Sequence, residues 1–484
     1  MKVIIDIFKS QITRKVMTEQ EVKDYNAFLE QKKQTRIESG FQIEESELNP
    51  MLFDFQKYCV RRALQAGKFA MFEDCGLGKT IQQLEWANKV VNHINKPVLI
   101  LAPLAVVSQT IKEGEKFGYN VNEVIDRDDV FTPNENCIYI TNYDNMEHVY
   151  AKAFGGIVLD ESSILKNFQG KTRTKLIEDF RNTPYKLACT ATPSPNDTTE
   201  ICNHAEFLDV MSRNEMLAMY FVHDGGNTSK WRLKGHATDV FWQWMSSWAV
   251  VITNPRDLDY EVEGYDLPKL NIHEIIVDGD KPIVETLTLT QRRQARKESL
   301  EERCKAAADL VNNSNENWLV WCNLNDESKL LHELINDSVE VKGSDKAKHK
   351  TDSSISFANG DIKCLVSKPL IFGMGLNFQS CHNMIFVGLS DSYEQYYQAV
   401  RRCWRFGQEH EVNVYIVISA KEGCVKENIE RKQEDANTMQ QEMLKHTKEI
   451  TKENIKATCR ISTPYNNNLK MILPVWREFK NECN

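Results

Sequence analysis

A glycine-rich turn, GLGKT at residues 76–80, follows the apolar run FAMFED and precedes a pattern typical of an amphipathic helix. In such a turn the backbone N–H groups of Gly76 and Gly78 can surround an anion, and the following helix directs its positive end toward it. Lys79 would then reach the β- and γ-phosphates of a bound nucleotide, and the Thr80 hydroxyl would hold Mg²⁺. A chance turn of this composition is the alternative, so the interpretation depends on the segments that follow.

Two adjacent acids, Asp160 and Glu161, end the apolar run in GIVLDESS. In a parallel sheet the carboxyl ends of the strands face the ligand crevice, so both side chains would lie beside the phosphate loop. Asp160 would hold Mg²⁺, mainly through water, and Glu161 would orient and deprotonate an attacking water. A solvated strand end is the alternative, but the upstream phosphate loop favours the catalytic interpretation.

A third group of polar side chains lies in YEQYYQAVRRCWRFGQ, residues 393–408. Gln398, Arg402 and Arg405 are spaced four and three residues apart, so a helix places them on one face. Hydrolysis of a nucleotide needs positive charge on the γ-phosphate in the transition state, and a neighbouring domain can supply it on closure. We therefore predict that these three residues act in catalysis. A solvated basic helix face is the alternative.

The elements that must position these residues alternate along the chain. Short β-branched runs, from FAMFED to YKLACTATP and again from NWLVWCN to VNVYIVIS, are separated by amphipathic helical stretches. This rhythm predicts an α/β fold with two parallel sheets joined by right-handed crossover helices. The expected units are an N-terminal appendage (1–48), a first α/β domain (49–193), an aromatic-rich helical insertion (194–270), a second α/β domain (271–421) and a C-terminal extension of exposed, charged helices (422–484).

The composition is that of a globular protein with several domains: 484 residues, of which 41% are hydrophobic and 27% charged. No run approaches the roughly 18 apolar residues that a membrane helix needs, so we expect no membrane contact and a cytoplasmic location. The net charge of −9 argues against nucleic-acid binding through bulk basicity but leaves room for a local groove. The 13 cysteines include no C-x-x-C pair, which predicts reduced core thiols and no zinc site.

Nine segments occur in a characteristic order: LFDFQ, GLGKT, LAPLAVVSQ, ITNYDN, LDES, TATPSPN, WLVWCN, FGMGLNF and QAVRRCWRFGQ. Over roughly residues 52–420 they resemble the motifs of superfamily 2 helicases and translocases, most closely the SWI/SNF-type branch. Glu73 and Asp74 fit this branch, which has acids where the general phosphate-loop pattern has glycine. The sequence departs from the branch at Trp404, where many remodellers have His, and after the acidic pair. The compact form resembles helicases of bacteriophages and prophages, which would place the protein in the cytoplasm of a bacterial host.

The resemblance implies two tandem RecA-like domains that bind ATP and Mg²⁺ in the cleft between them. By position in the family's motifs, Gln56 would read the adenine edge, and Gly375 would belong to a second-domain loop that senses ATP. Arg405 matches the family's arginine finger, with Arg402 as its partner. The implied enzyme is an ATP hydrolase of the helicase type.

Related motors run a nucleic-acid strand across both domains and grip its phosphates without sequence preference. The resemblance implies that Thr190 and Thr192 link hydrolysis to this grip. Lys230 and Arg232, beside Trp231, would suit a phosphate-and-stacking contact, although core packing also explains the tryptophans of the insertion. The candidate nucleic-acid contacts are Ser108, Thr141, Thr190, Thr192, Lys230, Arg232 and Asn377.

These features predict an ATP-dependent DNA translocase or helicase that acts on duplex or single-stranded DNA, with replication or recombination proteins as candidate partners. Two alternatives stay open. One is an RNA helicase or a remodeller of protein–nucleic-acid complexes, which the missing DEAD signature disfavours. The other is a nucleotide-gated scaffold with little hydrolysis, which the intact Lys79, Glu161 and Arg405 disfavour.

Overall fold

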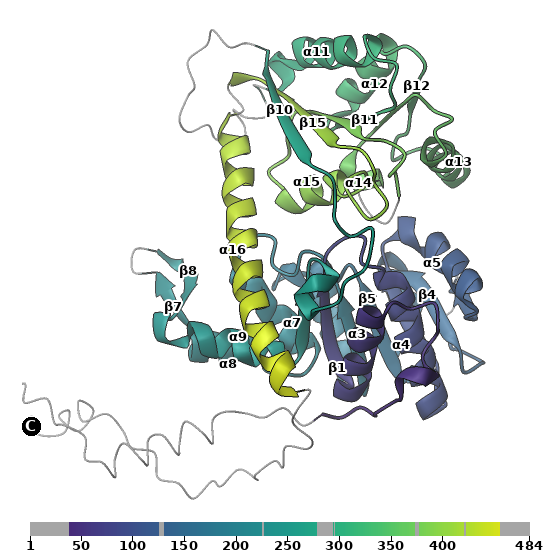
Figure 1. Ribbon diagram of the computed structural model, residues 1–484, viewed down its shortest axis with the longest axis vertical. Helices are drawn as coiled ribbons and strands as arrows, with labels where there is room; N and C mark the ends of the chain where they lie inside the picture. Colours follow the sequence, from purple (N-terminus) through teal and green to yellow (C-terminus); the bar gives the residue numbers. More distant parts are fainter. Residues whose placement is uncertain are drawn as a thin grey trace, which may run out of the picture. The chain divides into compact units, whose positions relative to one another are not determined.

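The computed structural model describes residues 38–124, 130–224, 227–277, 294, 296–372, 377–420 and 423–454. Within these residues lie two parallel β-sheets with helices packed on their faces (Figure 1). The expected α/β fold with two tandem RecA-like parallel-sheet domains is therefore confirmed.

The first sheet has seven strands in the order β3-β4-β2-β5-β6-β1-β9, and every neighbouring pair is parallel. Helices cover both faces of the sheet, and for this reason its central strands are continuous runs of buried side chains. Each apolar run predicted as a strand of this domain is a strand. The strands are β1 (Lys68–Glu73), β2 (Val98–Ala102), β3 (Val121–Glu123), β4 (Ile138–Asn142), β5 (Gly156–Asp160), β6 (Tyr185–Cys189) and β9 (Ala249–Ile252).

The helices of the first domain begin and end where the sequence changes character. α4 starts directly after the phosphate loop, and α5 ends at Gly118, whose φ of 82° lies in the left-handed region. The helices are α3 (Asp54–Ala66), α4 (Lys79–Ile94), α5 (Leu104–Phe117) and α6 (Lys171–Asp179), with 3₁₀ helices η1 (Glu45–Glu47), η2 (Asp144–His148), η3 (Ala151–Ala153) and η4 (Ser162–Lys166).

The segment expected to be a helical insertion, residues 194–270, also returns to the first sheet. Its strand β9 pairs in parallel with β1 and forms the edge of that sheet. The aromatic helix pattern runs closely into the apolar AVVI, and this hides the change from helical to strand periodicity. The other elements are α7 (Ile201–Phe207), α8 (Arg213–Tyr220), α9 (Thr238–Ser246), the antiparallel pair β7 (Phe221–Asp224) and β8 (Asn227–Leu233), and 3₁₀ helices η5 (Thr198–Glu200), η6 (Gly235–Ala237) and η7 (Pro255–Leu258).

The tryptophans of this segment are core residues. Trp242 and Trp248 are buried, and Trp231 and Trp244 pack against the same cluster, which continues onto side chains of the first sheet. Trp231 also packs on His223 of the neighbouring strand, with ring centroids 3.7 Å apart. The structure therefore supports the core interpretation of these tryptophans.

The second sheet has six parallel strands in the order β10-β15-β14-β11-β13-β12. Edge strand β10 is missing from the sequence-based prediction because its side chains are only partly buried or exposed. Fully buried Arg303 and Glu327 join two of the helices by an ion pair of 2.8 Å. The elements are β10 (Leu270–Ile276), α11 (Leu300–Asn312), β11 (Trp318–Cys322), α12 (Asn325–Leu334), β12 (Ser338–Glu340), α13 (Ala347–Ala358), β13 (Cys364–Ser367), α14 (Pro369–Phe372), β14 (Asn383–Val387), α15 (Tyr393–Val400) and β15 (Val412–Ile418).

The C-terminal extension contains one long helix, α16 (Gly423–Asn454) (Figure 1). Val425 and Ile429 pack into the core of the second domain, whereas Met443 is buried in the core of the first domain. Full exposure of this helix is therefore a wrong expectation, because α16 contacts both cores and packs on α9 and β9. Among the described residues, no helix is long and apolar enough to cross a membrane. Ten cysteines in the described part of the chain are free thiols, and all but Cys75 are buried.

Candidate active site

The phosphate loop joins β1 to α4, and its conformation requires glycine at two positions. Gly76 and Gly78 have φ angles of +90° and +76°, in the left-handed region that disfavours residues with a Cβ. A Cβ on Gly78 would lie 2.4 Å from Gln56 Nε2, and one on Gly76 would lie 3.2 Å from the backbone nitrogen of Phe406. Because Phe406 belongs to the second domain, the loop lies where the two domains meet.

Gln56 lies beside this loop with 3% of its surface exposed. Its Nε2 donates to the carbonyl oxygen of Leu77 (2.9 Å), and its Oε1 accepts from the backbone N–H of Phe53 (3.0 Å). Gln56 therefore joins the start of α3 to the phosphate loop. The adenine contact expected of Gln56 stays a prediction.

Lys79 folds back over the loop that carries it. Its Nζ donates to the carbonyl oxygens of Glu73 (2.9 Å) and Asp74 (3.0 Å). Burial by itself would lower the pKa of Lys79, but the neighbouring groups, first Cys75 and then Glu161, raise it. The ammonium group is therefore held in its charged form next to the loop.

The two predicted catalytic acids lie at the carboxyl end of β5, and β6 separates this strand from β1 in the sheet. Asp160 Oδ1 accepts from Gln83 Nε2 (2.8 Å), and the Asp160 carbonyl oxygen accepts from the Tyr143 hydroxyl (2.7 Å). Burial raises the pKa of the Asp160 carboxyl. The sequence leaves Gln83 and Tyr143 unassigned, although Gln83 follows Lys79 by four residues on α4, and this helical spacing is a signal that could identify it.

Glu161 has a φ of +54°, which residues other than glycine rarely adopt. Its Oε2 accepts from Thr190 Oγ1 and from Gln398 Nε2, both at 3.4 Å. Thr190 follows β6 and Gln398 belongs to α15, so both domains contact this carboxylate. Burial, and next the charge of Asp160, raise the pKa of Glu161 to about 7. A carboxylate with a pKa near neutrality is suited to proton transfer.

The second domain contributes two arginines to this site, of which Arg402 is buried and Arg405 is partly buried. Arg402 Nε donates to the carbonyl oxygen of Gln398 (3.1 Å), and Arg405 Cβ lies 3.6 Å from where a Cβ on Gly76 would be. Burial lowers the pKa of Arg402, and burial together with the charge of Arg402 lowers the pKa of Arg405 to about 10. An anion between such groups would stabilise both charges, and nucleotide phosphates provide one. The predicted catalytic side chains thus come together where the two domains meet, while their roles stay predictions.

Two residues that the sequence leaves without a predicted role join the second domain to the end of β1. Arg401 Nη2 donates to Asp74 Oδ2 (2.6 Å) and to the carbonyl oxygen of Cys75 (2.8 Å). Tyr397 donates its hydroxyl to Asp74 Oδ1 (2.5 Å). Tyr397 and Arg401 are four residues apart, so they share a face of the helical segment, and this spacing is the only sequence signal that they carry.

Two family models match this chain. The SNF2-related domain matches residues 58–218, and the helicase conserved C-terminal domain matches residues 302–407. The chain belongs to the SNF2-type branch of the superfamily 2 helicases. The first match contains β1 to β6, and the second contains β11 to β14 and α15, so each family domain contains most of the strands of one sheet.

A curated relative is the protein named "Uncharacterized ATP-dependent helicase YqhH" of Bacillus subtilis (strain 168), which is 30% identical over 152 residues. These residues are 29% of this chain and 26% of that protein, so the chain spans about a quarter of the relative's length. Among solved structures, the "Sulfolobus solfataricus SWI2/SNF2 ATPase core in complex with dsDNA" superimposes with a TM-score of 0.41 and 18% sequence identity, over 78% of this chain and 90% of that one.

In this SNF2-type protein three of the predicted nucleic-acid contacts are buried hydroxyls. Thr141 is 1% exposed and donates to the carbonyl oxygen of Val124 (3.0 Å). Thr190 is fully buried beside Glu161, and Thr192 is 6% exposed. The hydroxyls of these threonines lie in the interior, and the nucleic-acid contacts expected at these positions stay predictions.

The other candidate contacts are distributed over both domains. Ser108 on α5, Arg232 on β8 and Asn377 are exposed. Lys230 lies on β8, whereas Gly375 lies outside the described residues. The three exposed side chains remain candidate contacts.

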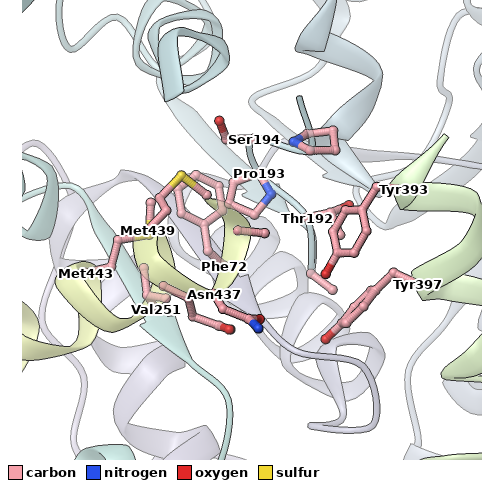
Figure 2. Close-up of a pocket in the computed structure, with 14 residues that line it drawn as sticks. Phe72, Thr192, Pro193, Ser194, Val251, Tyr393, Tyr397, Asn437, Met439 and Met443 are labelled. Carbon is pink, nitrogen blue, oxygen red and sulfur yellow. The ribbon is translucent and has the colours of Figure 1, made fainter. Parts of the chain in front are cut away.

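A small cavity lies between the segment after β6 and two helices (Figure 2). Figure 2 shows residues 192–194 near Tyr393 and Tyr397 of α15, with Met439 and Met443 of α16 on the other side. The cavity volume of about 40 Å³ has room for a few water molecules at most, so it is a packing gap and not a nucleotide site. The segment after β6 thereby lies against both α15 and α16.

Proposed function

We propose that this protein hydrolyses ATP in the cleft between its two sheet domains and uses the cycle to move along DNA, as a translocase or helicase. The observation that carries the proposal is the position of Glu161. This partly buried carboxylate accepts hydrogen bonds from Thr190 of its own domain and from Gln398 of the other. A catalytic base held by both domains makes hydrolysis depend on how the domains meet. The name of the Bacillus relative, an ATP-dependent helicase, supports the use of ATP.

In the proposed reaction the phosphate loop and Lys79 bind the β- and γ-phosphates through backbone N–H groups and the ammonium group. Glu161 orients the attacking water and accepts its proton, for which a pKa of about 7 is well matched to neutral solution. Arg402 and Arg405 then stabilise the charge that develops on the transferred phosphoryl group. The acid and the two arginines come from different domains, so domain closure completes the site.

Thr80 and Asp160 would hold Mg²⁺. Thr80 is the second residue of α4, and Asp160 ends β5 at the same edge of the sheet. Their hydroxyl and carboxylate oxygens are the hard ligands that Mg²⁺ prefers, and a cation would compensate the buried charge of Asp160. Gln83 would orient this carboxylate through its hydrogen bond. When bound, Mg²⁺ neutralises part of the charge of the β- and γ-phosphates.

The proposed DNA contacts are the exposed Ser108, Arg232 and Asn377, which would bind phosphate oxygens without reading the sequence. Because the net charge of the chain is −9, binding must depend on such local contacts and not on bulk basicity. Sequence-independent binding is what a translocating motor requires, since every step presents a new sequence.

The steady-state ATPase rate tests this function. We would measure the purified chain alone and with duplex DNA, single-stranded DNA or single-stranded RNA, with Glu161→Gln as the control for contaminating ATPases. Strong stimulation by either form of DNA is the expected result. Stimulation by RNA alone would replace DNA by RNA as the track. A rate that no nucleic acid changes would overturn the motor function and favour the scaffold alternative.

A further inference from the structure

The helical segment that carries the proposed catalytic arginines has a second polar face. Gln398 and Arg402 lie four residues apart on the face that meets Glu161, whereas Tyr397 and Arg401 lie four residues apart on a neighbouring face. This second face contacts Asp74, the residue between β1 and the phosphate loop. One helical segment therefore holds the catalytic side chains and a contact to the loop on which they act.

The contact is a buried ion pair with additional hydrogen bonds. Asp74 is 9% exposed and Arg401 is 3% exposed, and Arg401 Nη2 lies 2.6 Å from Asp74 Oδ2. The same nitrogen donates to the carbonyl oxygen of Cys75, and the other carboxylate oxygen of Asp74 accepts from Tyr397. Charged hydrogen bonds of this kind fix distance and direction more strictly than a surface ion pair does.

Neighbouring side chains hold the two second-domain residues in place. The Arg401 guanidinium lies 5.0 Å from the centroid of the Trp404 ring, and Trp404 Nε1 donates to the carbonyl oxygen of Pro268 (2.7 Å). The rings of Tyr393 and Tyr397 lie 5.7 Å apart, beside the segment after β6 (Figure 2). Trp404, a departure from the family pattern, thus has a structural role beside Arg401.

The three arginines differ in what balances their charge. Asp74 raises the pKa of Arg401 despite burial, whereas burial lowers the pKa of both Arg402 and Arg405. The charge of Arg401 is therefore balanced by a carboxylate of the protein. Phosphates of a bound nucleotide would add negative charge beside the other two.

We propose that Asp74, Tyr397 and Arg401 form an interdomain clamp that positions the phosphate loop against Arg402 and Arg405. In this clamp Arg401 is a positioning residue and does not bind the nucleotide. The inference rests on the proposed hydrolysis of ATP. It goes further by assigning a separate task to the arginine that the family motif does not include.

The first test is a double-mutant cycle of Asp74→Ala and Arg401→Ala, read as kcat and KM for ATP. Each single variant should lower kcat by about 100-fold, the loss expected when catalytic groups are displaced by about 1 Å, with KM changed less than about threefold. The double variant should be no slower than either single variant, because the clamp is lost once. Arg401→Lys keeps the charge and should recover part of the lost kcat.

A matched control is Arg256→Ala, which removes an exposed arginine paired with Asp266 and should leave kcat unchanged. The proposal would be overturned if the two single variants, Asp74→Ala and Arg401→Ala, had different effects on kcat. If Asp74→Ala keeps the wild-type kcat while Arg401→Ala abolishes it, Arg401 acts on the nucleotide itself. Tyr397→Phe, which preserves the ring and its packing, should lower kcat by about threefold to tenfold.

The second test does not depend on ATP hydrolysis, so it separates failure of the clamp from failure of the proposed function. Hydrogen–deuterium exchange of the nucleotide-free full chain would be compared for wild type and for Tyr397→Phe and Arg401→Ala. Loss of the clamp should accelerate exchange by at least about tenfold in peptides covering residues 73–80 and 396–406. Unchanged exchange in both peptides would overturn the clamp even if the ATPase rate fell.

Discussion

The two sides of the contact between the domains carry opposite charge and come from different kinds of element. In the first domain, acids follow the carboxyl ends of two strands of a parallel sheet. In the second domain, arginines follow one another at the end of a single helix. We call these sides the acidic wall (Glu73, Asp74, Asp160 and Glu161) and the basic wall (Arg401, Arg402 and Arg405).

Burial shifts the pKa values of the two walls in opposite directions. It raises the pKa of Glu161 to about 7 and lowers the pKa of Arg405 to about 10, and in both cases a neighbouring like charge adds to the effect. Asp74 and Arg401 connect the walls directly. Each wall alone holds like charges away from water, which destabilises the fold. The opposite wall reduces this electrostatic cost, and a nucleotide with Mg²⁺ would reduce it further.

The largest effect is expected from a substitution that removes one charge from the acidic wall without changing its shape. In Glu161→Gln the amide cannot accept the proton of the attacking water, so turnover should fall by about 10⁴-fold. ATP binding should persist because the phosphate loop is unchanged. Single-turnover hydrolysis measures the first effect, and titration with a fluorescent ATP analogue measures the second. Retained hydrolysis would remove Glu161 from the role of catalytic base.

The corresponding change on the basic wall is Arg405→Ala. We expect kcat to fall on the order of 10³-fold with little change in the KM for ATP, because the guanidinium acts on charge that develops in the transition state. DNA-stimulated steady-state kinetics measures both constants. The exposed Arg256→Ala serves again as the control. An unchanged kcat would assign the charge to Arg402 instead.

Local sequence predicts the strands of the first domain and the acids of the acidic wall. Parallel strands are buried on both faces, so each is an apolar run, and Asp160 and Glu161 end such a run directly. The pairing of β9 with β1 and the insertion of Met443 into the first core could not be predicted, because packing between distant segments determines both. The helical periodicity of the sequence indicates which residues of α16 are apolar, but it does not indicate which domain's core they join.

Contacts between the walls escape prediction for a similar reason. Asp74 and Arg401 lie 327 residues apart, and only the docking of the two domains makes them partners. Hydroxyls show the same limit on a smaller scale. Thr141 follows the pattern of a strand end that faces a ligand, but its proximity to the carbonyl oxygen of Val124 decides that the hydroxyl bonds inward.

The pH dependence of kcat/KM reports the protonation of Glu161 in the acidic wall. A carboxyl with its pKa raised to about 7 is protonated, and so inactive as a base, below that pH. kcat/KM should therefore fall by about tenfold per pH unit below about pH 7 and level off above it. Arg405, with a pKa of about 10, keeps its charge over this range. A profile that stays flat down to the ordinary pKa of a glutamate would contradict the raised pKa.

The smallest expected effect concerns a charge that belongs to neither wall. Arg232 is exposed on β8 and belongs to neither the acidic nor the basic wall. It is a proposed phosphate contact. Arg232→Ala should weaken the apparent affinity for DNA by a few-fold and reduce the slope of log affinity against log salt by about one, without changing the DNA-independent ATPase rate. The DNA concentration that gives half-maximal stimulation, measured at several salt concentrations, tests this. Arg256→Ala, another exposed arginine, should leave the slope unchanged. If both variants behave alike, the effect is one of net charge, and β8 is not part of the DNA path.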